Sequence, residues 1–288
     1  MSSDKYPEET DRRRFVKGVV GGSALAGAGA AGVTTVNSLT NPTGVGGGVT
    51  QFYGIELLSG PAPRGMPQIP IEIDDKGYLK GVFPDEGEMD IGGITYKPEW
   101  FQYCGVQTYP GVQPGADFDN YFRYPSNLSD PTYEWMSEVE PGSRFHVDHF
   151  SDYKTWGNEV GDEGIGKPAR GSWRSQGLSP QETMPIEVIR SERVEEMSSE
   201  SDWLAESTEQ GFIAYLDKCT HFCCVPGFKH TGQSEQYDAG NNVFCPCHQS
   251  IYDPFSVLRQ SFVALPRPEG GAGGGGGGGG NGGGGGGH

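Results

Sequence analysis

The chain is poor in basic residues: 21 Lys and Arg stand against 38 Asp and Glu, which gives its 288 residues a formal charge of −17. A surface of this sign repels nucleic-acid phosphates, so we expect no DNA or RNA partner. Acidic, Lys-poor chains stay soluble at high salt, where screening suppresses self-repulsion, and the composition therefore predicts a salt-adapted prokaryotic source. Ordinary solubility at low salt is the alternative explanation.

Charge is absent from residues 18–51, and a short basic segment precedes them. Residues 18–36 are mainly Ala, Gly and Val and are long enough for one weakly apolar membrane span. Residues 12–17 read RRRFVK, and the Arg12–Arg13 pair resembles the twin-arginine signal that exports folded proteins. An ordinary positive-inside anchor with a chance Arg pair is the alternative. No clear small-x-small cleavage site follows, which favours an uncleaved anchor.

The two ends of the chain are predicted to lie outside the folded domain. Residues 1–17 would form the basic part of the signal, residues 18–36 the anchor helix and residues 37–51 a flexible Gly-rich tether. Residues 270–288 are almost all Gly and are expected to be a disordered tail. The remaining residues, 52–269, are predicted to form one soluble domain held at the membrane surface.

Long helical periodicity is lacking in this domain, whereas short alternating runs between Gly, Pro, Asp and Ser clusters are common. The pattern predicts an antiparallel all-β fold. Residues 109–181 show little periodicity and are expected to form loops or an insertion on the sheet. A short helix is expected near residues 199–207, with Ser201 as its N-cap. The expected strands are residues 69–73, 94–96, 144–148, 186–189, 211–216 and 257–265.

Cysteine is rare, with six residues, yet five of them lie between residues 219 and 247. Residues 219–224 read CTHFCC, and residues 245–253 read CPCHQSIYD. The Cys-x-His and Cys-x-x-His spacings could serve a tetrahedral zinc site or a two-iron two-sulfur cluster with two Cys and two His ligands. Zinc would leave the three other local cysteines without a role, so we favour the iron–sulfur interpretation.

These two motifs resemble those of the Rieske iron–sulfur family, C-T-H-x-G-C and C-P-C-H-G-S. The resemblance implies one Rieske-type 2Fe–2S cluster, with Cys219 and Cys245 on the inner iron and His221 and His248 on the outer one. It also implies a fold in which a small cluster-binding subdomain, residues 217–255, is carried by an antiparallel β base domain. The strand pattern agrees with that fold.

The same resemblance implies a disulfide between Cys224 and Cys247 that ties the two motifs together. Such a bond persists only in an oxidising compartment, which is consistent with an export signal. Cys223 stands where the family has Gly and is left over, as is Cys104. We therefore expect a second disulfide, Cys104–Cys223, with two free thiols as the alternative. Gln249 is the other departure from a family Gly, and both loops are expected to differ locally in backbone.

Two hydroxyls beside the second motif are typical of high-potential members of the family. By resemblance, Ser250 donates a hydrogen bond to a bridging sulfide and Tyr252 donates one to a cysteine sulfur. Two neutral imidazoles in place of thiolates, together with such hydrogen bonds, favour the reduced state. The Leu265-Pro266-Arg267-Pro268 segment loosely resembles the family's proline-rich loop that shields the cluster.

The resemblance implies an electron-transfer subunit of a cytochrome bc-type, quinol–cytochrome c reductase complex on the outer face of the cell membrane. His221, His248 or both would contact a membrane quinol, and the partners would be a cytochrome b-type subunit and a cytochrome c-like or copper acceptor. A Rieske subunit of another exported oxidoreductase, related to arsenite or nitrate enzymes, is the main alternative. A zinc-stabilised binding module is a third. His146, His149 and His230 are expected to be surface or satisfied core residues.

Overall fold

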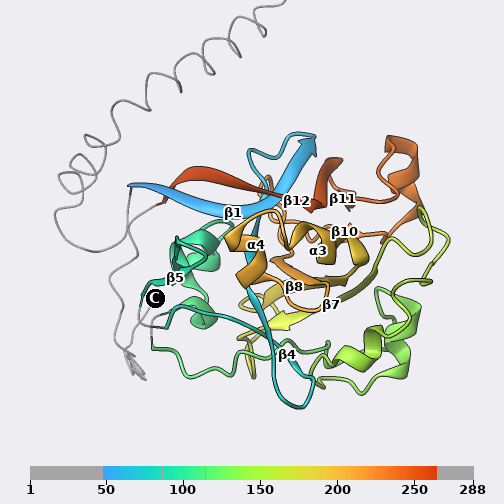
Figure 1. Ribbon diagram of the computed structural model, residues 1–288, viewed down its shortest axis with the longest axis horizontal. Coiled ribbons are helices and arrows are strands. Elements are labelled where there is room, and N and C mark those ends of the chain that lie inside the picture. Colours follow the sequence, from blue (N-terminus) through green and yellow to red (C-terminus); the bar gives the residue numbers. More distant parts are fainter. Residues whose placement is uncertain (1–47, 86, 114, 265–288) are drawn as a thin grey trace, which may run out of the picture.

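A computed structural model of the chain describes residues 48–264, except residues 86 and 114 (Figure 1). Its main feature is an eight-stranded sheet in the order β10-β11-β12-β1-β2-β9-β8-β7, and every strand pair in it is antiparallel. The sheet curls until it is nearly closed. Two small sheets, β3-β4 and β5-β6, lie outside it. The predicted antiparallel, mostly β fold is confirmed at this level.

The elements have the following bounds. The strands are β1 (Gly48–Ser59), β2 (Met66–Ile69), β3 (Ile71–Ile73), β4 (Leu79–Gly81), β5 (Met89–Ile91), β6 (Ile94–Tyr96), β7 (Lys167–Trp173), β8 (Met184–Arg190), β9 (Phe212–Leu216), β10 (Gly227–Phe228), β11 (Val243–Cys245) and β12 (Ser250–Ala264). The α-helices are α3 (Glu192–Met197) and α4 (Asp202–Ser207), and the 3-10 helices are η1 (Pro98–Phe101), η2 (Val106–Thr108), η3 (Pro110–Val112), η4 (Glu134–Glu138), η5 (Val147–Phe150) and η6 (Gly232–Tyr237).

The long strands β1 and β12 form a ribbon that crosses the molecule. They pair from Gly48 with Ala264 to Ser59 with Ile251, with two register shifts along the way. In Figure 1 the helices α3 and α4 lie between this ribbon and the β7–β8 hairpin. Because β11 pairs with the start of β12, the ribbon also holds the loop that carries the second cysteine motif.

Aromatic side chains fill the space inside the curled sheet. Trp100, Trp173 and Trp203 are almost fully buried, and Trp100 and Trp203 lie with ring centroids 5.1 Å apart. Trp203 comes from α4, whose N-cap is Ser201: its Oγ accepts the N–H of Leu204 at 3.2 Å. The short helix predicted around residues 199–207 is thus confirmed, with slightly later bounds. The helix α3 was not foreseen.

Three expectations about local structure are wrong. Residues 144–148 form only isolated bridges, because His146 Nδ1 accepts the N–H of Asp148 and starts the 3-10 turn η5. Part of the expected insertion, residues 109–181, is the edge strand β7, which pairs along its whole length with β8. Residues 48–51, expected in the tether, begin β1.

Within the described part of the chain, no helix is long and apolar enough to cross a membrane. The expected signal pair Arg12–Arg13, the anchor at residues 18–36 and the rest of the tether lie outside the described residues. So do the proline-containing segment at residues 265–268 and the Gly-rich tail at residues 270–288. These remain predictions.

Candidate metal centre

Two loops at one end of the sheet bring the cysteine motifs together. The first loop, residues 219–224, follows β9, and the second loop, residues 245–250, joins β11 to β12. The loops make matching turns: the N–H of Cys223 donates to Cys219 O at 3.1 Å, and that of Gln249 donates to Cys245 O at 2.9 Å. Each turn therefore begins at a predicted cysteine ligand.

Both turns close on a residue in the left-handed backbone region. Cys223 has φ 64° and Gln249 has φ 57°. These are the two positions where the sequence departs from the Gly of the Rieske motifs. The left-handed conformation that Gly adopts readily is retained here by non-Gly residues, at a cost of about 1 kcal/mol each.

On the inner side of the loops, two thiols lie in the protein core. Cys219 and Cys245 are both fully buried. The Tyr252 hydroxyl lies 3.2 Å from Cys219 Sγ. Hydrogen bonds from the Cys245 thiol, from Tyr252 and from the backbone N–H of His221 and Phe222 outweigh burial and lower the pKa of Cys219 to about 5. The same contact with Cys219 is the largest cause that raises the pKa of Cys245. The surroundings thus stabilise a thiolate at Cys219.

On the outer side, the imidazoles of His221 and His248 lie side by side. Their ring centroids are 4.7 Å apart, and their planes are nearly perpendicular, at 85°. His221 is partly buried, and its Nδ1 is a buried atom without a hydrogen-bond partner among the described residues. His248 is exposed. The side chain of Phe222, which is 66% exposed, packs against both rings.

This donor set fits a Rieske-type cluster. Two buried sulfurs face inward and two imidazoles face outward, which is the asymmetric ligation that such a cluster needs. A metal ligand role would account for the unpartnered Nδ1 of His221, since a buried polar atom in a protein usually has a partner.

A different metal group is also possible at the same loops. The Sγ atoms of Cys224, Cys245 and Cys247 all lie within 4.8 Å of one another and could hold a metal ion. This group shares only Cys245 with the predicted ligand set. It includes neither histidine, so the two arrangements can be separated by substitution.

A proline-containing strap covers both loops, and sequence reasoning missed it. The strap, residues 60–64, reads GPAPR and joins β1 to β2. The N–H of Ala62 donates to Ser250 Oγ at 3.3 Å, and Thr220 Oγ1 donates to Arg64 O at 2.6 Å. The strap therefore contacts both loops, while the shielding role expected of residues 265–268 stays a prediction because those residues lie outside the described ones. Its signal was a Pro-Ala-Pro sequence between two glycines, far from the motifs.

The hydroxyls predicted to tune the centre lie at the loops. Tyr252 is in contact with the Cys219 sulfur, as expected for a donor to a cysteine ligand. Ser250 is buried and accepts from Ala62, an interaction that the sequence did not indicate. Its own hydroxyl hydrogen has no acceptor recorded among the described residues and is free to donate.

Of the four cysteines outside the predicted ligand set, two are joined by a disulfide and two are free. The structure has the expected Cys104–Cys223 disulfide, with Cα atoms 5.4 Å apart. Cys224 and Cys247, expected to form the other bond, are free thiols, although their sulfurs lie within 4.8 Å. The pKa of Cys224 is raised to about 11, first by burial and then by the hydrogen bond with the neighbouring Cys247. Of the three possible pairings, this placement suits only Cys104–Cys223 with Cys224–Cys247, and the second bond remains a prediction.

A buried acidic network lies behind the first loop. Glu187 accepts hydrogen bonds from the hydroxyls of Tyr133 and Tyr215. Arg170 Nε lies 3.0 Å from Asp217 Oδ2, two residues before Cys219 in the chain. Burial raises the pKa of both carboxyls, and the nearby Arg170 opposes this rise. No sequence signal distinguished these residues from surface charges.

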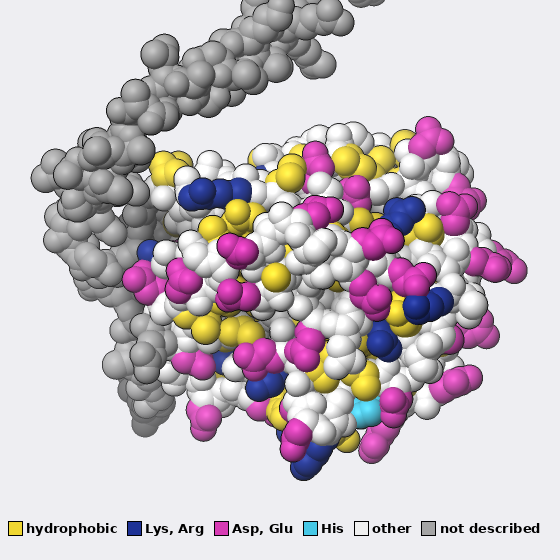
Figure 2. Space-filling view, in the orientation of Figure 1, with side chains coloured by type: hydrophobic (Ala, Val, Ile, Leu, Met, Phe, Trp, Pro, Cys, Tyr) yellow, Lys and Arg dark blue, Asp and Glu magenta, His cyan; other side chains and the backbone are white. Residues whose placement is uncertain are grey.

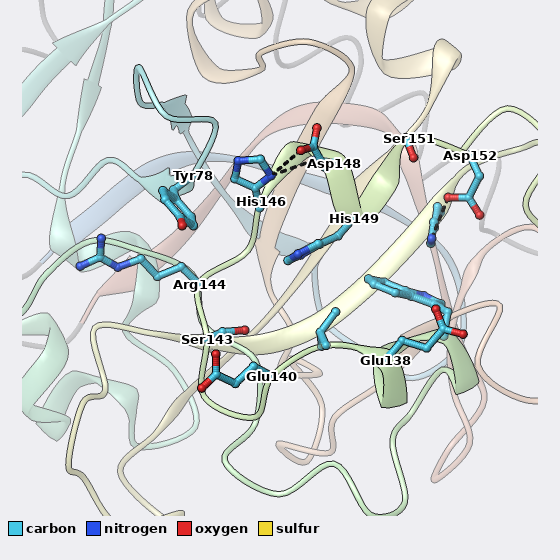
Figure 3. A pocket seen from close by; sticks show the side chains of 13 residues that line it. Tyr78, Glu138, Glu140, Ser143, Arg144, His146, Asp148, His149, Ser151 and Asp152 are labelled. Carbon is cyan, nitrogen blue, oxygen red and sulfur yellow. Dashed lines mark hydrogen bonds and ion pairs between the residues drawn. The ribbon is translucent and has the colours of Figure 1, made fainter.

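One open hollow of the surface lies away from the two loops, and most of its titratable side chains already have partners. It has a volume of about 810 Å³ and is lined partly by His146, Asp148, His149 and Asp152 (Figure 3). His146 pairs with Asp148 at 3.4 Å, and Asp152 with Lys167 at 2.7 Å. His149 Nδ1 is bonded to Tyr124. His146 and His149 are therefore satisfied, as expected, whereas His230 Nδ1 is buried without a partner among the described residues.

Comparisons with known proteins identify no relative. No family model matches the chain, and neither the curated proteins nor the solved structures contain a match.

Proposed function

We propose that the chain is an electron-transfer protein that holds one Rieske-type 2Fe–2S cluster through Cys219, His221, Cys245 and His248. The observation that carries the proposal is the meeting of these four side chains in two matching loops, with both thiols buried and both imidazoles on the outer side. When bound, such a cluster supplies a one-electron redox couple.

The protein groups around the sulfurs favour a high reduction potential. The Tyr252 hydroxyl and the N–H groups of His221 and Phe222 direct positive dipoles at Cys219 Sγ. Hydrogen bonds to ligand sulfurs stabilise added negative charge, so they make reduction easier. A high potential suits the oxidation of a membrane quinol, which we propose as the electron donor.

A surface with few charged residues at the loops supports a membrane-associated donor. Residues 57–63, 219–227 and 243–252, which include the strap's prolines and both loops, contain no charged residue in a chain of charge −17. Leu58, Phe222 and Val225 are among the exposed large hydrophobic residues. Figure 2 shows that acidic side chains are spread over the visible face of the molecule. Exposed apolar side chains near the proposed ligands suit contact with a quinol and a cytochrome b-type membrane subunit.

His248 is the better placed of the two imidazoles for the quinol. It is exposed, whereas His221 is partly buried. If one ring nitrogen of His248 held the iron, the other could accept a hydrogen bond from a quinol hydroxyl and take its proton when that nitrogen is deprotonated. A cytochrome c-like haem or a copper protein on the outer face of the cell membrane would then be the acceptor, in the manner of a quinol–cytochrome c reductase complex.

Reduction by quinol in membranes from the native source tests this function. We expect a quinol to reduce the centre and a quinol-site inhibitor of cytochrome b to block the reduction, as followed by electron paramagnetic resonance. If the centre is still reduced in the presence of the inhibitor and its reduction requires a soluble protein donor, quinol is not the electron donor. It would favour a subunit of another exported oxidoreductase.

The three neighbouring thiols of Cys224, Cys245 and Cys247 could hold a metal ion, which supports a second candidate: a metal-stabilised binding module without redox activity. Cys245→Ser should empty the site in either case, because Cys245 belongs to both donor sets, so Cys247→Ser and His248→Ala separate the candidates. Under our proposal, Cys247→Ser retains the bound metal and His248→Ala loses it. If Cys247→Ser also loses the bound metal while His248→Ala retains it, the metal is held by Cys224, Cys245 and Cys247, and the proposed function fails.

A further inference from the structure

The segment at residues 103–109 is bound to the first loop by several contacts besides the disulfide. The Tyr103 hydroxyl donates to Lys218 O at 2.8 Å, and Lys218 Nζ donates to the Tyr109 hydroxyl at 2.6 Å. The Cys104 sulfur lies 3.5 Å from Cys219 O. These contacts are made to Lys218 and Cys219, at the start of the first loop. Near the end of the loop, the disulfide at Cys223 is the link to this segment.

Without that bond, little burial holds the outer part of the loop. Phe222 is 66% exposed, Val225 is 41% exposed, and Cys223 is exposed as well. Segments with few buried contacts open locally at a low free-energy cost. The backbone bonds at stake are Cys223 N–H to Cys219 O and Cys219 N–H to Cys224 O, which shape the turn around His221.

The two neighbouring cysteines of the first loop point to different partners. Cys223 is bonded to Cys104 of the body, while the sulfur of Cys224 faces Cys247 of the second loop. A covalent bond at Cys223 therefore fixes the first loop to the body and not to the second loop. It closes a long connection, with a sequence separation of 119 residues.

We propose that the Cys104–Cys223 disulfide is a positioning device that holds the turn around His221 against the body, independently of any link between the two loops. Its effect on the bound cluster rests on the proposed function, whereas its effect on the backbone does not. Cys104 and Cys223 would thereby set the orientation of the His221 ring, which packs against Phe222.

The variant Cys104→Ala/Cys223→Gly tests the positioning role without adding backbone strain. It removes the bond, and Gly suits the φ of 64° at residue 223. The matched control is Gln249→Gly, which makes the same replacement at a φ of 57° in the second loop, where there is no disulfide. In metal-free protein, we expect the backbone amides of residues 219 and 223, each compared with the intrinsic rate for its sequence, to exchange hydrogen at least tenfold faster than in wild type in the double variant only. Exchange within twofold of wild type would overturn the proposal.

The iron-loaded protein provides a spectroscopic readout that a general loss of stability would not produce. We expect the double variant to broaden or shift the electron paramagnetic resonance lines of the reduced protein, and Gln249→Gly to leave them in place. If the lines are unchanged in the double variant, the disulfide does not set the orientation of the His221 ring. If wild type itself binds no iron, the proposed function fails, but the exchange experiment still decides the backbone role. Should the double variant not fold, Cys104→Ala alone removes the same bond and undergoes both measurements.

Discussion

The hydroxyl of Tyr252 links a single residue to the redox property of the centre. It lies 3.2 Å from Cys219 Sγ and is buried. We expect Tyr252→Phe to lower the midpoint potential by roughly 60 mV, because a hydrogen bond to a charged group contributes about 1.5 kcal/mol and this equals roughly 60 mV for one electron. Redox titration measures the change. Tyr237→Phe, at an exposed tyrosine, is the control, and equal potentials in both variants would contradict the role of Tyr252.

His230 gives the fold a specific sensitivity to acid. Burial first, and then the charge of Arg170, lower the pKa of His230 to about 4. The unfolded chain takes up a proton at this residue near pH 6.5, so the stabilisation is complete above pH 6.5 and is lost as the pH falls toward 4. Between pH 7.5 and 4.5, we expect wild type to lose about 2 to 3 kcal/mol more unfolding free energy than His230→Phe.

Denaturant unfolding at the two pH values measures this difference. Other titrating groups are common to both proteins and cancel in the comparison. Parallel losses in wild type and His230→Phe would show that His230 does not titrate differently in the folded and unfolded chains.

At the residue scale, the sequence indicated the proposed ligands but not the residues that surround them. The spacing of Cys219, His221, Cys245 and His248 is a local property, so it could be recognised without coordinates. The contact of Ala62 with Ser250 joins residues 188 positions apart, and no local pattern indicates it. The left-handed backbone at Cys223 was equally hidden, because Cys rarely adopts it.

At the scale of elements, the strap fixes the position of the second loop. Gly60 has φ +101°, and a Cβ there would lie 2.5 Å from Ser250 Cα and 2.8 Å from Gln249 O. We expect Gly60→Ala to cost about 2 to 4 kcal/mol of unfolding free energy, from backbone strain and from a clash with backbone that cannot move aside.

Gly87→Ala is the matched control for this substitution. Gly87 also has φ +101°, but a Cβ there would meet nothing within 4 Å among the described residues. It should therefore show the strain without the clash, as measured by denaturant unfolding. If Gly60→Ala and Gly87→Ala lower the unfolding free energy equally, close packing of the strap against the second loop does not contribute to the effect of Gly60→Ala.

The elements that could be predicted were those with a clear local signal. The core strand β9 is a continuous apolar run, β8 is apolar apart from Glu187 and Arg190, and α4 has a serine cap and buried apolar residues. The edge strand β7 reads KPARGSW and lacks alternation, so its place beside β8 comes from tertiary pairing. Residues 144–148 alternate like a strand, but the His146 cap diverts them into a turn.

At the scale of the whole molecule, the charge of −17 makes stability depend on salt. Raising KCl from 0.1 to 1 M shortens the Debye length from about 10 to 3 Å and weakens repulsion among surface carboxylates. We expect the unfolding free energy to rise by an amount on the order of 1 kcal/mol over this range.

A variant with less negative charge checks the cause of that increase. Glu134, Glu138 and Glu140 are exposed, and replacing all three by Gln changes the formal charge from −17 to −14. The salt dependence should then be weaker. A salt effect of the same size in this variant and in wild type would assign it to general exclusion of salt from the surface.

The central claim is that two buried thiols and two outer imidazoles hold an iron–sulfur cluster, and its most direct test is the metal content of purified, oxygen-protected protein. We expect about two iron atoms and two acid-labile sulfides per chain, as a two-iron two-sulfur cluster requires, with a rhombic resonance signal on reduction. Protein that contains neither iron nor labile sulfide, and instead carries one zinc ion per chain, would contradict the account.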